Sequence, residues 1–145
     1  MPLQISRSER EGVILLELKG RLVAGGESTI LREAVKELAA SGPVNIILNL
    51  AGIDYIDSTG LGGMVICFTT VRKAGGSIKL LNLSRRNIEL LVLTKLETVF
   101  EVFNDEQDAV NSFFPGREVK KFDILAFVQQ NRRDWNSRAM VQPQV

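Results

Sequence analysis

Apolar and polar residues recur along the chain in blocks whose spacing predicts strands and helices in alternation. Residues 3–6 and 13–19 have the pattern of strands, and the polar segment S-E-R-E-G before Val13 predicts a hairpin turn. From Ser28 onward, apolar residues follow the i, i+3, i+4, i+7 spacing of an amphipathic helix, which the S-G-P run ends. Residues 44–50 form a β-rich run with apolar side chains on both faces, which indicates a largely buried strand.

The second half of the chain continues this alternation. Residues 58–73 predict a helix that ends at an A-G-G run, and residues 78–83 predict a strand. Ser84 and Asp105 each precede a further helical pattern and are expected as N-caps, with a short strand at 99–103 between those helices. The expected order is ββαβαβαβα. Because single helices between strands require right-handed crossovers, we expect an α/β fold with a mixed, largely parallel β-sheet and about four helices.

The end of the chain differs in charge from the rest. Residues 1–115 carry 12 Lys and Arg against 14 Asp and Glu, whereas residues 116–145 carry 6 against 3. A Pro-Gly pair marks the change, so we expect one domain over residues 1–114 and a basic C-terminal extension over residues 115–145. The spacing of Phe122 and Leu125 favours a helix in the extension, although D-I-L-A-F-V also fits a strand. We expect the end of the extension to be disordered. It contains Trp135, which is either a docking residue or simply exposed.

The composition excludes several classes of function. Histidine is absent and Cys67 is the single cysteine, which excludes a Ser-His-Asp triad, a Cys-His pair, histidine-ligated metals and disulfides within the chain. A carboxylate-only Mg²⁺ site and a lysine-assisted nucleophile stay open on this ground, but we predict no catalytic residue, metal site or cofactor. The net charge of +1 gives no footprint for direct nucleic-acid binding. No apolar run approaches the ~20 residues of a membrane span and no signal peptide is visible, so we expect a cytoplasmic protein without membrane insertion.

The predicted helix at 58–73 has two distinct faces. Placing residues 100° apart puts one apolar face toward the core, with Cys67 at its edge. The other face is small and weakly polar around one large apolar residue, Ile66, and a solvent-only face would carry more Glu, Lys and Arg. This pattern favours a docking surface for a flat partner, although single exposed apolar residues are also common. The core face holds Leu61, Met64, Val65, Phe68 and Val71, and the outer face holds Thr59, Gly62, Gly63, Ile66, Thr69, Thr70 and Lys73.

Ser58 lies at the start of this helix, in the segment I-D-S-T-G-L-G. Local chemistry alone favours an N-cap, in which Ser58 or Asp57 accepts a backbone hydrogen bond worth about 1 kcal/mol. The alternative is that Ser58 receives a phosphate, since a helix N-terminus tolerates the added charge of about −1.5 to −2. A nucleophile lacks a base nearby in the sequence, and no G-x-x-x-x-G-K-[ST] phosphate loop is present.

The strand–loop–helix N-I-I-L-N-L-A-G-I-D-Y-I-D-S-T-G-L-G resembles the signature of STAS domains, specifically of bacterial anti-sigma factor antagonists. The later segments G-G-S-I-K-L-L-N, I-E-L-L-V-L-T-K-L and V-F-E-V-F-N-D-E-Q-D-A-V also fit, so the resemblance covers about residues 3–113 and implies the STAS fold. It implies a non-enzymatic switch that binds an anti-sigma factor, itself a serine kinase of the GHKL type, and thereby releases a sigma factor. Phosphorylation of Ser58 by that kinase would weaken the complex, and a PP2C-type phosphatase would restore it.

The resemblance and the helix geometry together define the expected partner-binding residues. They are Asp57, Thr59, Gly60, Gly62, Gly63, Ile66, Thr70 and Arg21. The family often has acidic residues after the glycine that ends the second strand, whereas this chain reads G-R-L-V there, which places Arg21 and Val23 in the acidic positions and puts the identity of the kinase in question.

Two other functions compete with this prediction. One keeps the fold but makes the chain an accessory STAS subunit of a membrane transporter or a stress-signalling scaffold, in which Ser58 is only a cap. The other is an enzyme or a nucleotide-binding protein, against which the missing histidine, phosphate loop and paired catalytic groups argue.

Overall fold

The computed structural model describes residues 3–130, and its elements follow the predicted order ββαβαβαβα with one added 3-10 helix, η1. In chain order they are β1 Gln4–Arg10, β2 Val13–Leu22, α1 Gly26–Ala39, β3 Asn45–Ile56, α2 Ser58–Lys73, β4 Ser77–Leu81, α3 Arg85–Leu93, η1 Leu96–Thr98, β5 Val102–Phe103 and α4 Glu106–Asn111. The predicted caps of α3 and α4 are confirmed, because Ser84 accepts from the backbone N–H of Asn87 and Asp105 accepts from that of Asp108.

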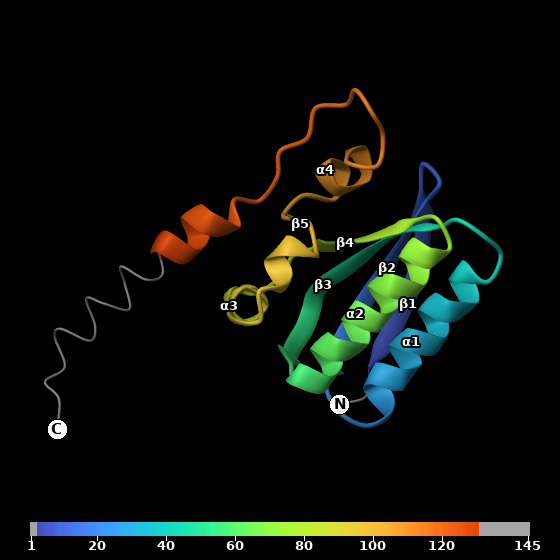
Figure 1. Ribbon diagram of the computed structural model, residues 1–145, viewed down its shortest axis with the longest axis horizontal. Helices are drawn as coiled ribbons and strands as arrows, with labels where there is room; N and C mark the ends of the chain where they lie inside the picture. Colours follow the sequence, from blue (N-terminus) through green and yellow to red (C-terminus); the bar gives the residue numbers. More distant parts are fainter. Residues whose placement is uncertain (1–2, 131–145) are drawn as a thin grey trace, which may run out of the picture.

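The strands form one sheet in the order β1-β2-β3-β4-β5, in which only the β1–β2 pair is antiparallel (Figure 1). The hairpin is tighter than predicted, since β1 continues to Arg10, which pairs with Val13. Glu11 and Gly12 both have positive φ, 53° and 84°, the geometry of a two-residue turn whose twist matches that of the flanking strands. The predicted α/β fold with a largely parallel sheet is confirmed.

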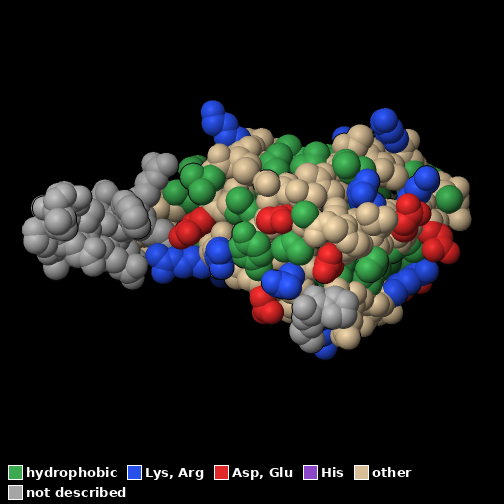
Figure 2. Space-filling view, turned by 90° about the horizontal axis from the view of Figure 1, so that it is seen from below, with side chains coloured by type: hydrophobic (Ala, Val, Ile, Leu, Met, Phe, Trp, Pro, Cys, Tyr) green, Lys and Arg blue, Asp and Glu red, His purple; other side chains and the backbone are tan. Residues whose placement is uncertain are grey.

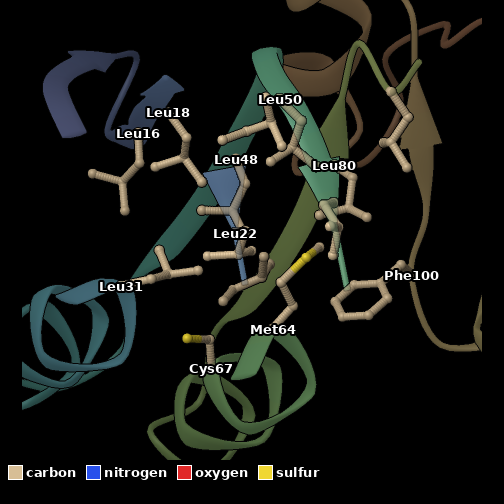
Figure 3. Close-up of a cluster of buried hydrophobic side chains, with 14 of the residues drawn as sticks. Leu16, Leu18, Leu22, Leu31, Leu48, Leu50, Met64, Cys67, Leu80 and Phe100 are labelled. Atoms are coloured by element: carbon tan, nitrogen blue, oxygen red, sulfur yellow. The ribbon is translucent and has the colours of Figure 1, made fainter. Parts of the chain in front are cut away.

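The two faces of the sheet carry different helices. Side chains of α1, α2 and α3 join one large buried cluster with the sheet, and in Figure 1 α1 and α2 lie side by side across the strands. Figure 3 shows Met64 and Cys67 of α2 reaching toward the leucines of β2, β3 and β4. On the opposite face α4 packs against β4 and β5, and its Ala109 and Val110 belong to a smaller apolar cluster.

β3 is longer than the sequence indicates. The prediction ended this strand at Leu50 and treated the following residues as a loop, whereas β3 continues to Ile56. The pairing with β2 shifts register twice, and this allows Lys19 to pair with Gly52 and Leu22 with Ile56. A Cβ at Gly52 would lie 2.8 Å from the carbonyl oxygen of Leu18, so glycine permits the close approach of the two strands.

The first part of the C-terminal extension packs on the domain. The backbone N–H of Phe122 donates to the carbonyl of Val102 in β5 at 3.4 Å, and Phe122, Ile124 and Phe127 contact the large core cluster. Residues 124–130 are helical, as the apolar spacing favoured. The expected disordered end and Trp135 lie outside the described residues.

Candidate functional site

Asp57 joins three segments at the junction of β3 and α2. Its Oδ1 accepts from the backbone N–H of Gly60 at 2.7 Å, and its Oδ2 accepts from that of Ala24, in the β2–α1 loop, at 3.0 Å. Its own N–H donates to the carbonyl of Leu22 at 3.2 Å. The N–H of Gly60, and after it that of Ala24, holds the pKa of the Asp57 carboxyl below its ordinary value of 3.8, because both donors favour the anion.

Asp57 is therefore the N-cap of α2, and Ser58 is the first helical residue. The interpretation of Ser58 itself as the cap is wrong, because the neighbouring carboxylate already accepts the hydrogen bond from Gly60. Ser58 and Thr59 are both exposed, and within residues 3–130 the Ser58 hydroxyl has no hydrogen-bond partner. The arrangement leaves a free hydroxyl at the positive end of a 16-residue helix.

The three glycines of the first two turns of α2 have different surroundings. A Cβ at Gly60 would lie 2.6 Å from the carbonyl carbon of Leu22, so α2 begins in direct contact with the backbone of β2. A Cβ at Gly63 would overlap Oγ of Ser28 in α1, whereas one at Gly62 would have nothing within 4 Å. The placement of Gly63 on the outer face is thus wrong, because α1 packs against this side of α2 and buries it.

The rest of the outer face agrees with the helix geometry. Ile66 is 50% exposed, Gly62 is exposed, and half-buried Thr70 donates from Oγ1 to the carbonyl of Ile66 at 2.9 Å. On the inner side Cys67, placed at the edge of the core face, is fully buried, and burial raises the pKa of its thiol to about 12. Phe68 is only half-buried and packs edge-on against Phe100 with ring centroids 5.3 Å apart.

Ile30 on α1 is a further exposed apolar residue, at 46%, which the sequence analysis did not single out. Its signal was available, because Ile30 precedes the buried Leu31 and falls outside the i, i+3, i+4 stripe of its helix, as Ile66 does in α2. α1 and α2 pack side by side (Figure 1), and each carries one exposed isoleucine.

Arg21 lies at the carboxyl end of β2. It is exposed and aligns with Tyr55 of β3, one residue before the Leu22–Ile56 pair. Because Leu22 bonds to Asp57, Arg21 belongs to the same edge of the sheet as the start of α2.

A groove of about 280 Å³ opens beside Ser58, between the start of α2 and helix α3. The guanidinium carbon of Arg86 lies over the ring of Tyr55, 4.5 Å from its centroid, and Asn87 is buried with no hydrogen-bond partner for its Nδ2 in the described part of the chain. No sequence pattern marks either residue, because about 30 positions separate them from Tyr55 and Ser58. The groove is lined by Tyr55, Ile56, Asp57, Ser58, Arg86, Asn87, Glu89, Leu90 and Leu93.

The end of the molecule at which α2 begins has mixed character. Figure 2 views it from that side and shows apolar side chains lying between charged side chains of both signs. Neither sign dominates, whereas a nucleic-acid interface presents a basic stripe. Within residues 3–130, no helix is long and apolar enough to cross a bilayer, and no group of three or more acidic, histidine or cysteine side chains is arranged to hold a metal ion.

Comparisons with known proteins agree with the resemblance in the sequence. The STAS domain family model matches residues 4–109. The anti-sigma-B factor antagonist of Bacillus subtilis is 34% identical over 102 residues, which cover 70% of this chain and 92% of that protein. The structure of the anti-sigma factor antagonist SpoIIAA in its unphosphorylated form matches with a TM-score of 0.67 and 18% identity over 79% of this chain and 100% of its own.

A murine anion transporter, solute carrier 26 family member A9, matches with a TM-score of 0.61 and 22% identity over 71% of this chain and 18% of its own. Likeness to SpoIIAA and to this transporter at such low identity concerns the fold alone. The family model and the Bacillus subtilis relative go further. This chain belongs to the STAS domain family and, within it, to the anti-sigma factor antagonists.

Proposed function

We propose that this protein binds an anti-sigma factor and so releases a sigma factor, and that phosphorylation of Ser58 switches the binding off. The observation that supports a phosphorylation switch lies at the start of α2, where Asp57 caps the helix and the Ser58 hydroxyl stays exposed. A serine with a structural hydrogen bond would lose it on modification, whereas Ser58 has none to lose among the described residues. SpoIIAA, which shares the fold, is known in a phosphorylated form.

The physical effect of the phosphate separates folding from binding. A charge of about −1.5 to −2 at a helix N-terminus interacts favourably with the macrodipole, by roughly 0.3–1 kcal/mol per unit at an exposed site. The domain therefore keeps its fold. The docking surface gains an anion, and binding then costs the desolvation of that anion and any repulsion between it and acidic groups of the partner. The chain acts in this scheme as a binding switch, with no catalytic residue of its own.

The proposed partners are an anti-sigma factor that is also a GHKL-type serine kinase and a PP2C-type phosphatase. The proposed contact surface consists of exposed and half-buried residues around Ser58. The exposed ones are Arg21, Thr59, Gly62 and Ile66, and the half-buried ones are Asp57 and Thr70. Gly60 and Gly63 support this surface from below, by letting α2 approach β2 and α1.

A pull-down with purified wild type, Ser58→Ala and Ser58→Asp tests the switch. Wild type and Ser58→Ala should retain the anti-sigma factor, and Ser58→Asp should lose it while melting within a few degrees of wild type. Incubation with the captured kinase and ATP, followed by peptide mass spectrometry, should place the phosphate on Ser58 rather than Thr59. Phosphate on Thr59 alone, or unchanged binding by Ser58→Asp together with a phosphorylated protein that still binds, would refute the proposal.

A second pair of variants tests the docking face of α2. Ile66→Lys places a charge where a half-exposed isoleucine should enter the interface. Burying the exposed half of such a side chain is worth about 0.8–1.5 kcal/mol, or roughly four- to twelvefold in affinity, and burying the lysine charge adds to the loss. Cys67→Ala is its matched control, because Cys67 is adjacent in sequence but buried in the core. We expect Ile66→Lys to lose binding and keep stability, and Cys67→Ala to do the opposite; equal binding by both would move the interface elsewhere.

A further inference from the structure

The groove beside Ser58 contains a cation held in place by its surroundings. Arg86 lies in the first turn of α3, and the central carbon of its guanidinium lies over Tyr55, 4.5 Å from the ring centroid. A cation over an aromatic ring is attracted by the charge distribution of the ring and needs no oxygen acceptor there, and the guanidinium donates no hydrogen bond to another described residue. Within residues 3–130 Arg86 forms no ion pair, whereas its neighbour Arg85 pairs with Glu89 at 3.4 Å.

Asn87 is a second, independent indication that the groove binds a hydrogen-bond acceptor. The residue is only 2% exposed and lines the groove, yet its Nδ2 has no hydrogen-bond partner in the described part of the chain. An unpaired buried amide donor is costly, and such groups are rare in folded proteins. The last torsion of an asparagine side chain is soft, so a small turn of the amide can present this donor to an acceptor in the groove.

We propose that the groove receives the phosphoryl group of phosphorylated Ser58, with the Arg86 guanidinium as its main donor and the Asn87 amide as a second. Ser58 lines the same groove as both donors, so a phosphate on Ser58 enters the space that they face. The inference rests on the proposed modification of Ser58 and adds what holds the phosphate afterwards. It makes the phosphorylated form a structurally defined state, with the anion paired to α3.

The acidic groups of the groove do not oppose this pairing strongly. The Asp57 carboxylate is already bonded to the N–H groups of Gly60 and Ala24, and Glu89 is paired with Arg85. Tyr55, the remaining titratable group of the lining, lies under the guanidinium. Arg86 is thus the cation of the groove lining, and it has no acidic partner among the described residues.

The test measures the phosphate itself. Phosphoserine is incorporated at position 58 of the full chain during translation, and its second pKa is followed by ³¹P NMR across pH 4–8. Free phosphoserine titrates near pH ~6, and an opposite charge within hydrogen-bonding reach lowers a pKa by roughly 1–3 units in protected sites and less in an open groove. We expect a pKa about 0.5–1 unit higher in Arg86→Gln than in wild type, and a smaller rise in Asn87→Ala.

Lys95→Gln is the control, since it removes one positive charge from an exposed residue just after α3 that does not line the groove and pairs with no acidic side chain among the described residues. Its phosphate should titrate as in wild type. Equal titration in wild type, Arg86→Gln and Lys95→Gln would overturn the inference, as would equal shifts in the two variants, which indicate only general charge. Because no kinase or partner is used, these results are independent of whether the phosphate releases an anti-sigma factor.

Discussion

One methyl group added at Gly60, Gly62 or Gly63 should change the stability of the domain in three different ways. In Gly60→Ala the new Cβ lies 2.6 Å from the carbonyl carbon of Leu22, well inside the 3.4–4 Å of ordinary contact. The obstacle is strand backbone, which cannot rotate away, so α2 must shift from β2. Overpacking of this kind costs typically about 1–3 kcal/mol, and we expect the upper end of that range or more.

Gly62→Ala should have the opposite sign. Its Cβ meets nothing within 4 Å and the position is exposed, so only the helix propensity changes. Alanine is about 0.8–1 kcal/mol more favourable than glycine in a helix interior. Gly63→Ala lies between the two, because its Cβ meets Oγ of Ser28, a side-chain atom that Ser28→Ala removes.

Urea unfolding followed by circular dichroism measures these free energies, and melting temperatures should move by about 3–5 °C per kcal/mol in a domain of this size. The double variant Ser28→Ala with Gly63→Ala should recover most of the loss of the single Gly63 change, a coupling that non-contacting residues do not show. Stability changes of the same sign and size at Gly60 and Gly62 would show that α2 does not rest on β2 as described. Additive effects of the Ser28 and Gly63 changes would refute the contact between α1 and α2.

Three further predictions concern other contacts. Asp57→Ala removes the cap and should cost about 1 kcal/mol near neutral pH; since the folded pKa lies below 3.8, that stabilisation is lost as pH falls through it, and melting curves should converge with wild type in acid. Lys79 is 8% exposed, with Nζ 2.8 Å from Oγ of Ser112, but its ion-pair partner Glu101 is half-exposed. Lys79→Met keeps the packed aliphatic stem and should therefore lower the free energy of unfolding in urea by under ~1 kcal/mol, and Lys79→Ala should lower it by about twice that. Equal losses in the two variants would assign the stabilisation to the charge. Phe122→Ala should cost roughly 1.5–2 kcal/mol, about half the loss of a fully buried phenylalanine, and an unchanged melting temperature would show that the extension does not stabilise the domain.

The order of elements was predictable from the sequence because strand and helix patterns are local. The outer face of α2 was also predictable at Ile66, whose position follows from helix geometry alone. Gly63 was misplaced because a helical wheel assumes one buried side, whereas α2 packs against both the sheet and α1. The cap was ambiguous because Asp57 and Ser58 can both accept a hydrogen bond, and the N–H of Ala24, from a distant loop, helps to fix the carboxylate.

Arg86 and Asn87 illustrate a different limit. Nothing in the local sequence of α3 marks either residue, since an arginine and an asparagine in a first helical turn are ordinary. Their interest arises only because the sheet brings Tyr55 and Ser58 against that turn. A site that combines residues from two separate βα junctions can be recognised in the folded structure but cannot be predicted from the local sequence.

The hydrogen bond between Phe122 and Val102 bears on how the protein avoids self-association. β5 is the last strand of the sheet, and a free strand edge is a template for pairing with another chain. The extension occupies part of that edge, while the opposite edge, β1, presents exposed Arg7, Glu9 and Arg10, charges that disfavour strand addition. Truncation before residue 117 would therefore open one edge of the sheet, and the expected result is a chain that aggregates at concentrations at which the full-length protein stays monodisperse.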